Sequence, residues 1–534
     1  MFGFHLKINS YYFLLFLAAS LLLYWLCPKK YRYIPLLVES VVFLLLVDWK
    51  SIFFILFSMI VIFLCAYFID KNAKKQKDYI SLHKGEMTLE EKKAYKTKNK
   101  HIRKSLLVVG ILAVTILLGI MKYLGFLLGS VQSIVQLFGG NFAFELRGWF
   151  LPVGISFYTF QAIGYLVDVY WSKYEAERNP FRFALFMFYF PKLLQGPIVR
   201  YNEMKETLFE EKTLTYDNFT NGLKRMAFGY LKKMVVADAL MAFLKFAFAN
   251  VAELSGVESF LSVVLYFIQD YCDFSGYMDI AIGASMTFGI TLPENFNRPY
   301  FARNIDEYWR RWHITLGTWF KDYIFYPLSI SRFSLGIGKF FKKFSKGLGQ
   351  KMPAVFGLIV VWLLTGLWHG ASWNYVLWGG YYGVIIIISI FLEPLKNRFY
   401  EKTKISRNNV FIQIWQHLLT LFLLAFGKIL FMCNDLSSAW QMFVQCFHWN
   451  NLSLQNIWNQ IGDSSFFTAI SCFAPIFIVD LIQEIWPKTS FLSKFNRLPI
   501  YVRWPIMIAL IVVIVWFGWY GNGLPHFDFG YTQF

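Results

Sequence analysis

Long runs of apolar side chains constrain this chain more than any other feature of its sequence. We count roughly ten to twelve runs that approach the ~20 residues an α-helix needs to cross a bilayer. Backbone in lipid must satisfy its own hydrogen bonds, so these runs are predicted to be helices, whereas a membrane barrel would show short alternating segments. The clear runs cover residues 11–27, 34–47, 52–69, 105–128, 353–368, 376–392, 410–432, 466–482 and 504–519.

The composition and the placement of charge support an all-α integral membrane protein. Hydrophobic residues make up 57% of the 534 residues, against about 45–50% in soluble domains. The net charge of +19 would suit a nucleic-acid-binding protein, but no recognition motif accompanies it. Segment 71–104 alone holds twelve lysines and arginines, a pattern typical of cytoplasmic loops. We therefore expect no nucleic-acid partner and a basic cytoplasmic loop over 71–104.

The same charges predict an orientation in the membrane. Segment 429–487 contains no lysine or arginine and is expected to include an external loop. With this assignment, the N-terminus and the tail 520–534 both lie outside the cell. The segments predicted to be cytoplasmic are 28–32, 71–104, 396–407 and 488–503.

The middle of the chain, residues 148–330, differs from the clear spans. Prolines, glycines and polar residues interrupt it, which is typical of re-entrant or partly inserted helices that line a cavity. Four basic residues on the apolar segment 218–244 suggest a helix along the cytoplasmic interface. Without an internal repeat or a linker, we expect one membrane domain over 1–534, with a core over 148–380.

Two histidines in that core are candidate functional residues. His369 lies in GLWHGASWNYVLWGG and His313 in EYWRRWHITLGTWFKDY. An ionisable residue at bilayer depth is expensive, and imidazole exchanges protons near neutral pH, so the pair suggests proton-transfer chemistry. Each has an ordinary alternative, a structural role for His369 and a cytoplasm-proximal helix with basic side chains for His313. The histidine spacing fits no metal motif and neither has a cysteine nearby, so we predict no metal site.

The two histidine segments carry a family resemblance. WRRWHITLGTWFKDYIFYPL together with GLWHGASWNYVLWGG resembles the pair of histidine motifs of the membrane-bound O-acyltransferase family. Blocks at 151–171, 190–204 and 272–300 are similar to the bacterial alginate O-acetyltransferase branch of that family. The resemblance covers most of the chain.

The resemblance implies a fold and an activity. The fold would be a multi-helix disc with re-entrant helices, in which a cytoplasmic recess and an external funnel meet around a central tunnel. His369 matches the catalytic histidine, a general base, and His313 the second histidine; Trp312, Trp368 and Asn374 would line the tunnel. The donor would be cytoplasmic acetyl-CoA, with no permanently bound cofactor. The acceptor would be a sugar hydroxyl of an exported polysaccharide, outside the bacterial cell membrane.

The C-terminal residues FGYTQF resemble a tail of these systems. Tyr531 would then be an acyl carrier, working with an extracytoplasmic SGNH-type acetyltransferase as partner; the alternative is an aromatic anchor at the membrane surface. Two other functions remain open. One is a D-alanyl transferase that uses a carrier-protein donor, and the other is a transporter of polysaccharide or lipid-linked sugar, which broken helices and intramembrane aspartates would also suit.

Overall fold

A computed structural model describes residues 6, 8–141, 144, 150–211, 213–487 and 491–519. The clear apolar runs are helical over most of their length. Within the described residues, β-type pairing is limited to an isolated antiparallel bridge between Phe296 and Trp312. The expected all-α integral membrane fold is therefore confirmed.

Seven of the described helices are long and apolar enough to cross a membrane, fewer than the ten to twelve runs counted in the sequence. Two of the expected spans, α1 (Tyr11–Leu26) and α2 (Tyr33–Asp48), have 16 residues each and fall short of the ~20 needed. The seven candidate spans are Ser51–Leu82, Leu89–Leu137, Lys346–His369, Trp373–Thr403, Val410–Met432, Ser464–Ile485 and Ile500–Phe517.

The chain divides into two compact units. Unit 1 comprises residues 1–219 and 284–292, and unit 2 comprises residues 220–283 and 293–534. The division passes through two helices, α10 (Tyr216–Tyr230) and α12 (Gly256–Thr287). The single domain expected from the sequence stays a prediction.

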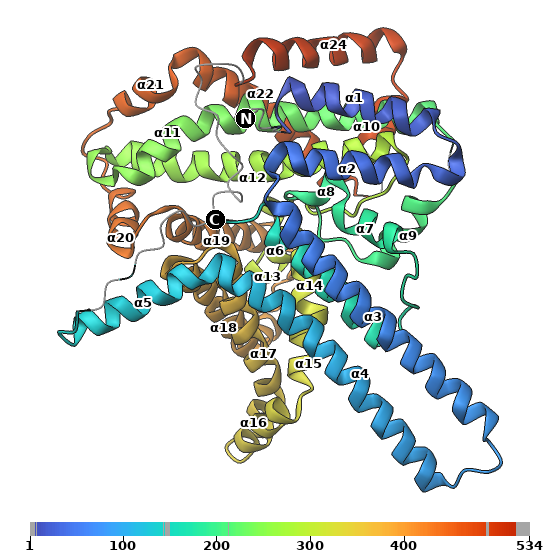
Figure 1. Cartoon of the computed structure of the whole chain (residues 1–534). Coiled ribbons are helices and arrows are strands. Elements are labelled where there is room, and N and C mark those ends of the chain that lie inside the picture. The colour runs from blue at the N-terminus through green and yellow to red at the C-terminus, as the bar shows by residue number, and fades with distance from the viewer. Residues whose placement is uncertain are drawn as a thin grey trace. The chain divides into compact units, whose positions relative to one another are not determined.

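Unit 1 contains a long pair of neighbouring helices, α3 (Ser51–Leu82) and α4 (Leu89–Leu118), which lie side by side (Figure 1). The helix α6 (Ile155–Tyr170), buried along almost its whole length, packs against both. The other elements of this unit are α1, η1 (Lys29–Tyr31), α2, η2 (Gly119–Tyr123), α5 (Leu124–Leu137), α7 (Pro180–Phe188), α8 (Phe190–Leu193) and α9 (Tyr201–Phe209).

The basic segment 71–104 is mostly helical, and its cytoplasmic location stays a prediction. The helix α3 continues to Leu82, and α4 begins at Leu89. Thr88 starts α4 with a capping box, because its hydroxyl accepts from the Glu91 N–H while the Glu91 carboxylate accepts from the Thr88 N–H. Lysine and glutamate favour helices, so a polar segment extends the two apolar helices instead of ending them.

Unit 2 contains a series of helices that pack one against the next, α16 (Arg332–Lys342), α17 (Lys346–His369), α18 (Trp373–Thr403) and α19 (Val410–Met432) (Figure 1). The middle of the chain is rich in short helices, as its prolines and glycines predict, but α12 is a continuous helix of 32 residues. The remaining elements are η3 (Leu231–Ala237), α11 (Asp238–Ala249), η4 (Val251–Glu253), η5 (Pro299–Phe301), α13 (Ile305–Arg311), α14 (Ile314–Phe320), η6 (Lys321–Phe325), α15 (Tyr326–Ser329), α20 (Leu436–Gln445), α21 (Gln455–Ile461), α22 (Asp463–Ile485), α23 (Phe491–Asn496) and α24 (Ile500–Phe517).

Glycines bring α17 and α18 close together beside His369. A Cβ atom on Gly379 of α18 would lie 2.2 Å from the Trp362 carbonyl oxygen of α17. A Cβ atom on Gly370, which follows His369, would lie 2.2 Å from the Tyr375 ring. Both distances are far below van der Waals contact, so these positions need glycine for packing.

We expect Gly379→Ala to destabilise the protein, because the new methyl group would force α18 away from α17. Overpacking of this kind costs about 1–3 kcal/mol. The matched control is Gly380→Ala on the same helix, where the nearest atom would be Leu363 Cδ2 at 4.0 Å. Thermal unfolding of the full-length protein in detergent should show a lower melting temperature for Gly379→Ala alone. Equal melting temperatures for the two variants would contradict the close packing.

Candidate active site

His313 lies in a left-handed backbone conformation between α13 and α14, with φ 48° and ψ 51°. Side chains disfavour this region, and such strained residues cluster at functional sites. Asn295 holds the turn that follows. Its carbonyl accepts from the Ile314 N–H at 3.0 Å, and its Oδ1 accepts from the Thr315 N–H and hydroxyl at 3.0 and 2.8 Å. The first turn of α14 therefore keeps His313 at a defined position.

The His313 ring is enclosed by aromatic side chains. Its exposed fraction is 2%, and its centroid lies 4.8 Å from that of Phe274 of α12 and 5.6 Å from that of Trp368 of α17. His313 lies outside the seven candidate spans. Burial lowers the pKa of His313 to about 3, because an imidazolium would lose its hydration there. The ring is therefore neutral at physiological pH.

His369 is the last residue of α17 and is equally buried, with an exposed fraction of 3%. Trp378 of α18 lies 4.8 Å from the His369 ring, and Phe431 of α19 lies 5.5 Å from it, measured between ring centroids. Three consecutive membrane helices of unit 2 thus contribute to the surroundings of this imidazole. An apolar enclosure of this kind strengthens electrostatic interactions and keeps bulk water out.

Trp368 joins the two histidines into one cluster. Its ring centroid lies 5.6 Å from that of His313 and 4.9 Å from that of its neighbour His369, edge-to-face in both cases. The structure thus brings together the three predicted site residues His313, Trp368 and His369, although 313 and 369 are far apart in the chain. Two buried imidazoles in one aromatic cluster can accept, hold and return a proton.

The other predicted site residues are placed differently. Trp312 packs edge-to-face against Phe296 with a centroid distance of 4.9 Å, on the chain segment that leads into His313. One amide N–H of Asn374 donates to the Cys433 carbonyl at 3.0 Å, so this group ties α18 to the end of α19. Tyr531 lies outside the described residues.

Residues that sequence reasoning missed also contribute to the cluster. Phe274 and Phe431 each contact one of the histidines. They are two of 59 phenylalanines, and nothing in the residues beside either one indicates a contact with a histidine. Lys428 did carry a signal, because it is a lysine inside the apolar run 410–432.

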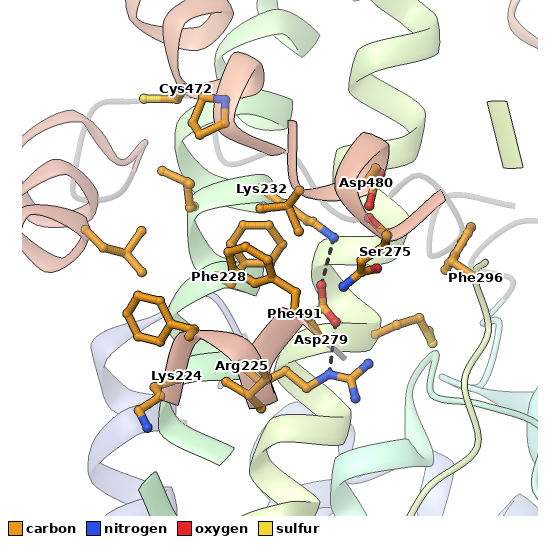
Figure 2. A pocket seen from close by; sticks show the side chains of 18 of the residues that line it. Lys224, Arg225, Phe228, Lys232, Ser275, Asp279, Phe296, Cys472, Asp480 and Phe491 are labelled. Atoms are coloured by element: carbon orange, nitrogen blue, oxygen red, sulfur yellow. Dashed lines mark hydrogen bonds and ion pairs between the residues drawn. The ribbon is translucent and has the colours of Figure 1, made fainter. Parts of the chain in front are cut away.

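A cavity of about 950 Å³ lies elsewhere in unit 2 (Figure 2). Its apolar wall includes Phe228 and several residues of α22, α23 and α24, such as Phe491. Its polar wall carries charges of both signs. The cationic lining residues are Lys224, Arg225, Lys232 and Arg298, and the acidic ones are Asp279, Glu294 and Asp480.

Asp279 binds two of these cations, as Figure 2 shows. Its carboxylate lies 2.8 Å from Lys232 Nζ and 3.0 Å from Arg225 Nε. Lys233 is also buried, and it pairs with Asp238 at 2.8 Å and with Asp273. The interfacial position expected for segment 218–244 stays a prediction. Within it, Lys232 and Lys233 of η3 are buried inside the protein, because acidic partners on α11 and α12 neutralise them.

Two aromatic rings in succession connect the cavity to His313. Phe296 lines the cavity and packs against Phe274 with a centroid distance of 5.0 Å. Phe274 in turn packs against His313. Asn295 and Ile314, which fix the backbone beside His313, are also cavity-lining residues. A molecule in the cavity would therefore lie close to the two-histidine cluster.

Comparison with known proteins shows which family the chain resembles. The model of the membrane-bound O-acyltransferase family matches residues 177–434, which include both histidines. The chain is 31% identical to the probable alginate O-acetylase of Azotobacter vinelandii, over 84% of this chain and 79% of that protein. It is 30% identical to the peptidoglycan O-acetyltransferase of Helicobacter pylori, over 76% and 79%. It is 27% identical to the teichoic acid D-alanyltransferase of Bacillus subtilis, over 52% and 68%.

The chain is a multi-pass helical membrane protein, and its sequence matches a class of membrane acyltransferases over most of its length. The chain belongs to the membrane-bound O-acyltransferase family. The family and the names of the relatives identify an O-acyltransferase enzyme. They favour this activity over the transporter that the sequence had left open.

Proposed function

We propose that the enzyme takes an acetyl group from cytoplasmic acetyl-CoA for the O-acetylation of an exported or cell-surface polysaccharide of a bacterium, with His369 as general base. The observation that supports this proposal best is the buried cluster in which Trp368 contacts both His313 and His369. It places the His369 imidazole, a proton acceptor, in an apolar enclosure where a hydroxyl could attack a thioester without competition from bulk water.

The names of the relatives support the acceptor class. The relatives from Azotobacter vinelandii and Helicobacter pylori are named for O-acetylation of alginate and of peptidoglycan, and both are matched over most of their length. Alginate and peptidoglycan both contain sugar units with free hydroxyl groups. A sugar hydroxyl outside the cell is accordingly the final acceptor in this proposal.

The transfer step uses one base and returns its proton. The His369 imidazole takes the proton of an incoming hydroxyl while that oxygen attacks the carbonyl carbon of the acetyl thioester. The carbon–sulfur bond then breaks, and the imidazolium gives its proton to the leaving thiolate. The products are an acetyl ester and free CoA thiol. His313, which is neutral at pH 7, orients the donor or relays the proton by hydrogen bonding.

The charged cavity supports a donor that carries phosphates. Lys224, Arg225 and the other lining cations would attract the phosphate groups of CoA, and the apolar wall suits its uncharged arm. Part of that wall comes from Phe491 and its neighbours, within segment 488–503 that the sequence predicts to be cytoplasmic. The proposed route leads from this cavity past Phe296 toward His313.

Delivery to the polysaccharide completes the proposal. Tyr531, in the tail predicted to lie outside the cell, receives the acetyl group as its phenolic ester. An extracytoplasmic SGNH-type acetyltransferase then passes it to the sugar. The predicted orientation, with both termini outside, supports this arrangement because it brings the tail to the acceptor side.

The test is labelling of the purified full-length protein with acetyl-CoA carrying a radioactive acetyl group, read out as label on the chain and as free CoA thiol. We expect the wild type to become labelled and Tyr531→Phe to release thiol only by slow hydrolysis. Label that survives Tyr531→Phe would remove the tail from the mechanism. If neither label nor thiol appears, even with the partner protein present, the donor is wrong. A D-alanyl carrier protein is then the donor to test.

A further inference from the structure

A buried ion pair joins two helices of unit 2 beside the histidine cluster. Lys428 lies in the candidate span Val410–Met432 of α19 and has an exposed fraction of 7%. Its ammonium group pairs with the carboxylate of Asp270, which comes from α12. A lysine at this depth is expensive, and such residues are retained where they serve a function.

The same ammonium group also lies over an aromatic ring. Lys428 Nζ is 4.5 Å from the centroid of the Trp312 ring and 5.3 Å from that of Tyr266. Cation–π attraction is strongest for tryptophan and in desolvated surroundings, and Trp312 has an exposed fraction of only 3%. Because Trp312 directly precedes His313, a force on its ring acts on the strained backbone of the next residue.

Helical spacing connects the ion pair to both histidines. Phe431 lies three residues after Lys428 on α19, and it contacts His369. Phe274 lies four residues after Asp270 on α12, and it contacts His313. Residues three or four apart share a helix face. The pair therefore ties together the two helices whose same faces contact the two imidazoles.

We propose that Lys428 and Asp270 are positioning residues for the O-acyltransferase reaction, and that they hold Trp312 and the two helices so that His313 and His369 keep their spacing. The inference rests on the proposed role of His369 as the base. Neither Lys428 nor Asp270 touches the reacting atoms in this proposal. Their effect is exerted through Trp312, Phe274 and Phe431.

A buried ion pair can fix the relative position of two helices more specifically than apolar packing. Replacing a buried pair by apolar residues often leaves stability unchanged or raises it, so stability alone does not explain Lys428. Removing a single partner is costly, because an uncompensated charge remains buried. A cation held by both Asp270 and Trp312 fixes the relative position of α12, α19 and the segment before His313.

The experiment compares three kinds of variant in the full-length protein. Lys428→Met and Asp270→Asn each leave one charge unpaired, Lys428→Met combined with Asp270→Asn removes both charges, and Lys428→Arg keeps the cation. The matched control is Lys351→Met on α17, which loses a bond from Nζ to the Ile390 carbonyl at 2.8 Å. The readouts are melting temperature, kcat and KM for thiol release from acetyl-CoA, and O-acetyl ester content in cells.

We expect the doubly neutral variant to regain the wild-type melting temperature but to keep a kcat at least 10-fold low, with KM within about 2-fold. Lys428→Arg should restore kcat to within about 3-fold, and Lys351→Met should keep wild-type kcat. A doubly neutral variant with wild-type kcat would overturn the proposal. Each charge would then serve only to neutralise the other, and neither residue would position the histidines. If the doubly neutral variant does not fold, Trp312→Phe tests the proposal in its place, because it keeps the ion pair and weakens the cation–π contact. We expect a lowered kcat in this variant. Wild-type kcat in Trp312→Phe overturns the proposal.

If acetyl-CoA is not the donor, the result differs from failure of the positioning proposal. Wild-type protein would then release no thiol from acetyl-CoA. The O-acetyl ester content of cells would still show whether the Lys428 variants lower acyl transfer. Failure of His369 as the base would show as wild-type turnover in His369→Ala, whatever the Lys428 variants do.

Discussion

Replacement of His369 by alanine is expected to lower acyl transfer by about 10²–10⁴-fold, the contribution typical of a positioned general base. The incoming hydroxyl would lose its proton acceptor, and the aromatic enclosure of Trp368, Trp378 and Phe431 offers no substitute base. The donor cavity does not include His369, so KM for the donor should change little while kcat falls. The measurement is thiol release by purified protein, together with ester content in cells that express the variant at the wild-type level.

A second membrane histidine provides the control for this variant. His417 of α19 bonds through Nδ1 to the Ala302 carbonyl at 3.0 Å and has no described contact with the cluster. We expect His417→Ala to retain most of the transfer activity. Near-normal acetylation by His369→Ala would show that another group is the base. An equal loss in both variants would indicate damage to the fold.

Replacement of His313 by asparagine is expected to reduce kcat about 10²-fold, because a misplaced donor or proton relay has effects of that size. Asparagine suits this test since it tolerates the left-handed conformation at φ 48° and does not titrate. Turnover of the purified variant at pH 7 measures the effect. A variant with wild-type turnover would give His313 a structural role alone.

The same variant is expected to change how stability depends on pH. Burial holds the pKa of folded His313 at about 3, below the ordinary value of 6.5, so between these pH values the unfolded chain binds more protons. The stability that neutral His313 contributes is present above pH 6.5 and is lost as the pH falls toward 3. The slope from one such group is at most about 1.4 kcal/mol per pH unit. Melting temperatures between pH 4 and 7 should fall less steeply for His313→Asn, and identical slopes would contradict this.

The helical membrane fold was predictable because it depends on a local property. An apolar run of sufficient length must become a helix in lipid, whichever residues surround it in space. Ion pairs between distant segments are not a local property, and hydropathy does not reveal them. Lys232 and Lys233 are neutralised by Asp279 and Asp273 of α12, which lie 47 and 40 residues further along the chain. Glycine and polar residues interrupt the sequence of α12, but the helix is continuous over 32 residues.

His313 and His369 were identifiable from their motifs, because a histidine beside apolar runs is rare and chemically costly. The family resemblance also paired them. Their contacts were not predictable, since nothing local indicates that Trp368 touches both rings. Phe274 and Phe431 were not identifiable for a related reason, because the identity of a phenylalanine does not indicate which side chain it contacts.

The sequence by itself determined that the chain is an all-helical membrane protein and which two imidazoles stand out in it. Both follow from hydropathy and from the identity of single residues, which do not depend on the rest of the fold. The tertiary structure alone decided that the imidazoles share an aromatic cluster. It alone decided that Asp270 neutralises Lys428 beside the Trp312 ring, and that Phe296 and Phe274 connect a charged cavity to His313. These are relations between distant segments, and they exist only once the helices have packed.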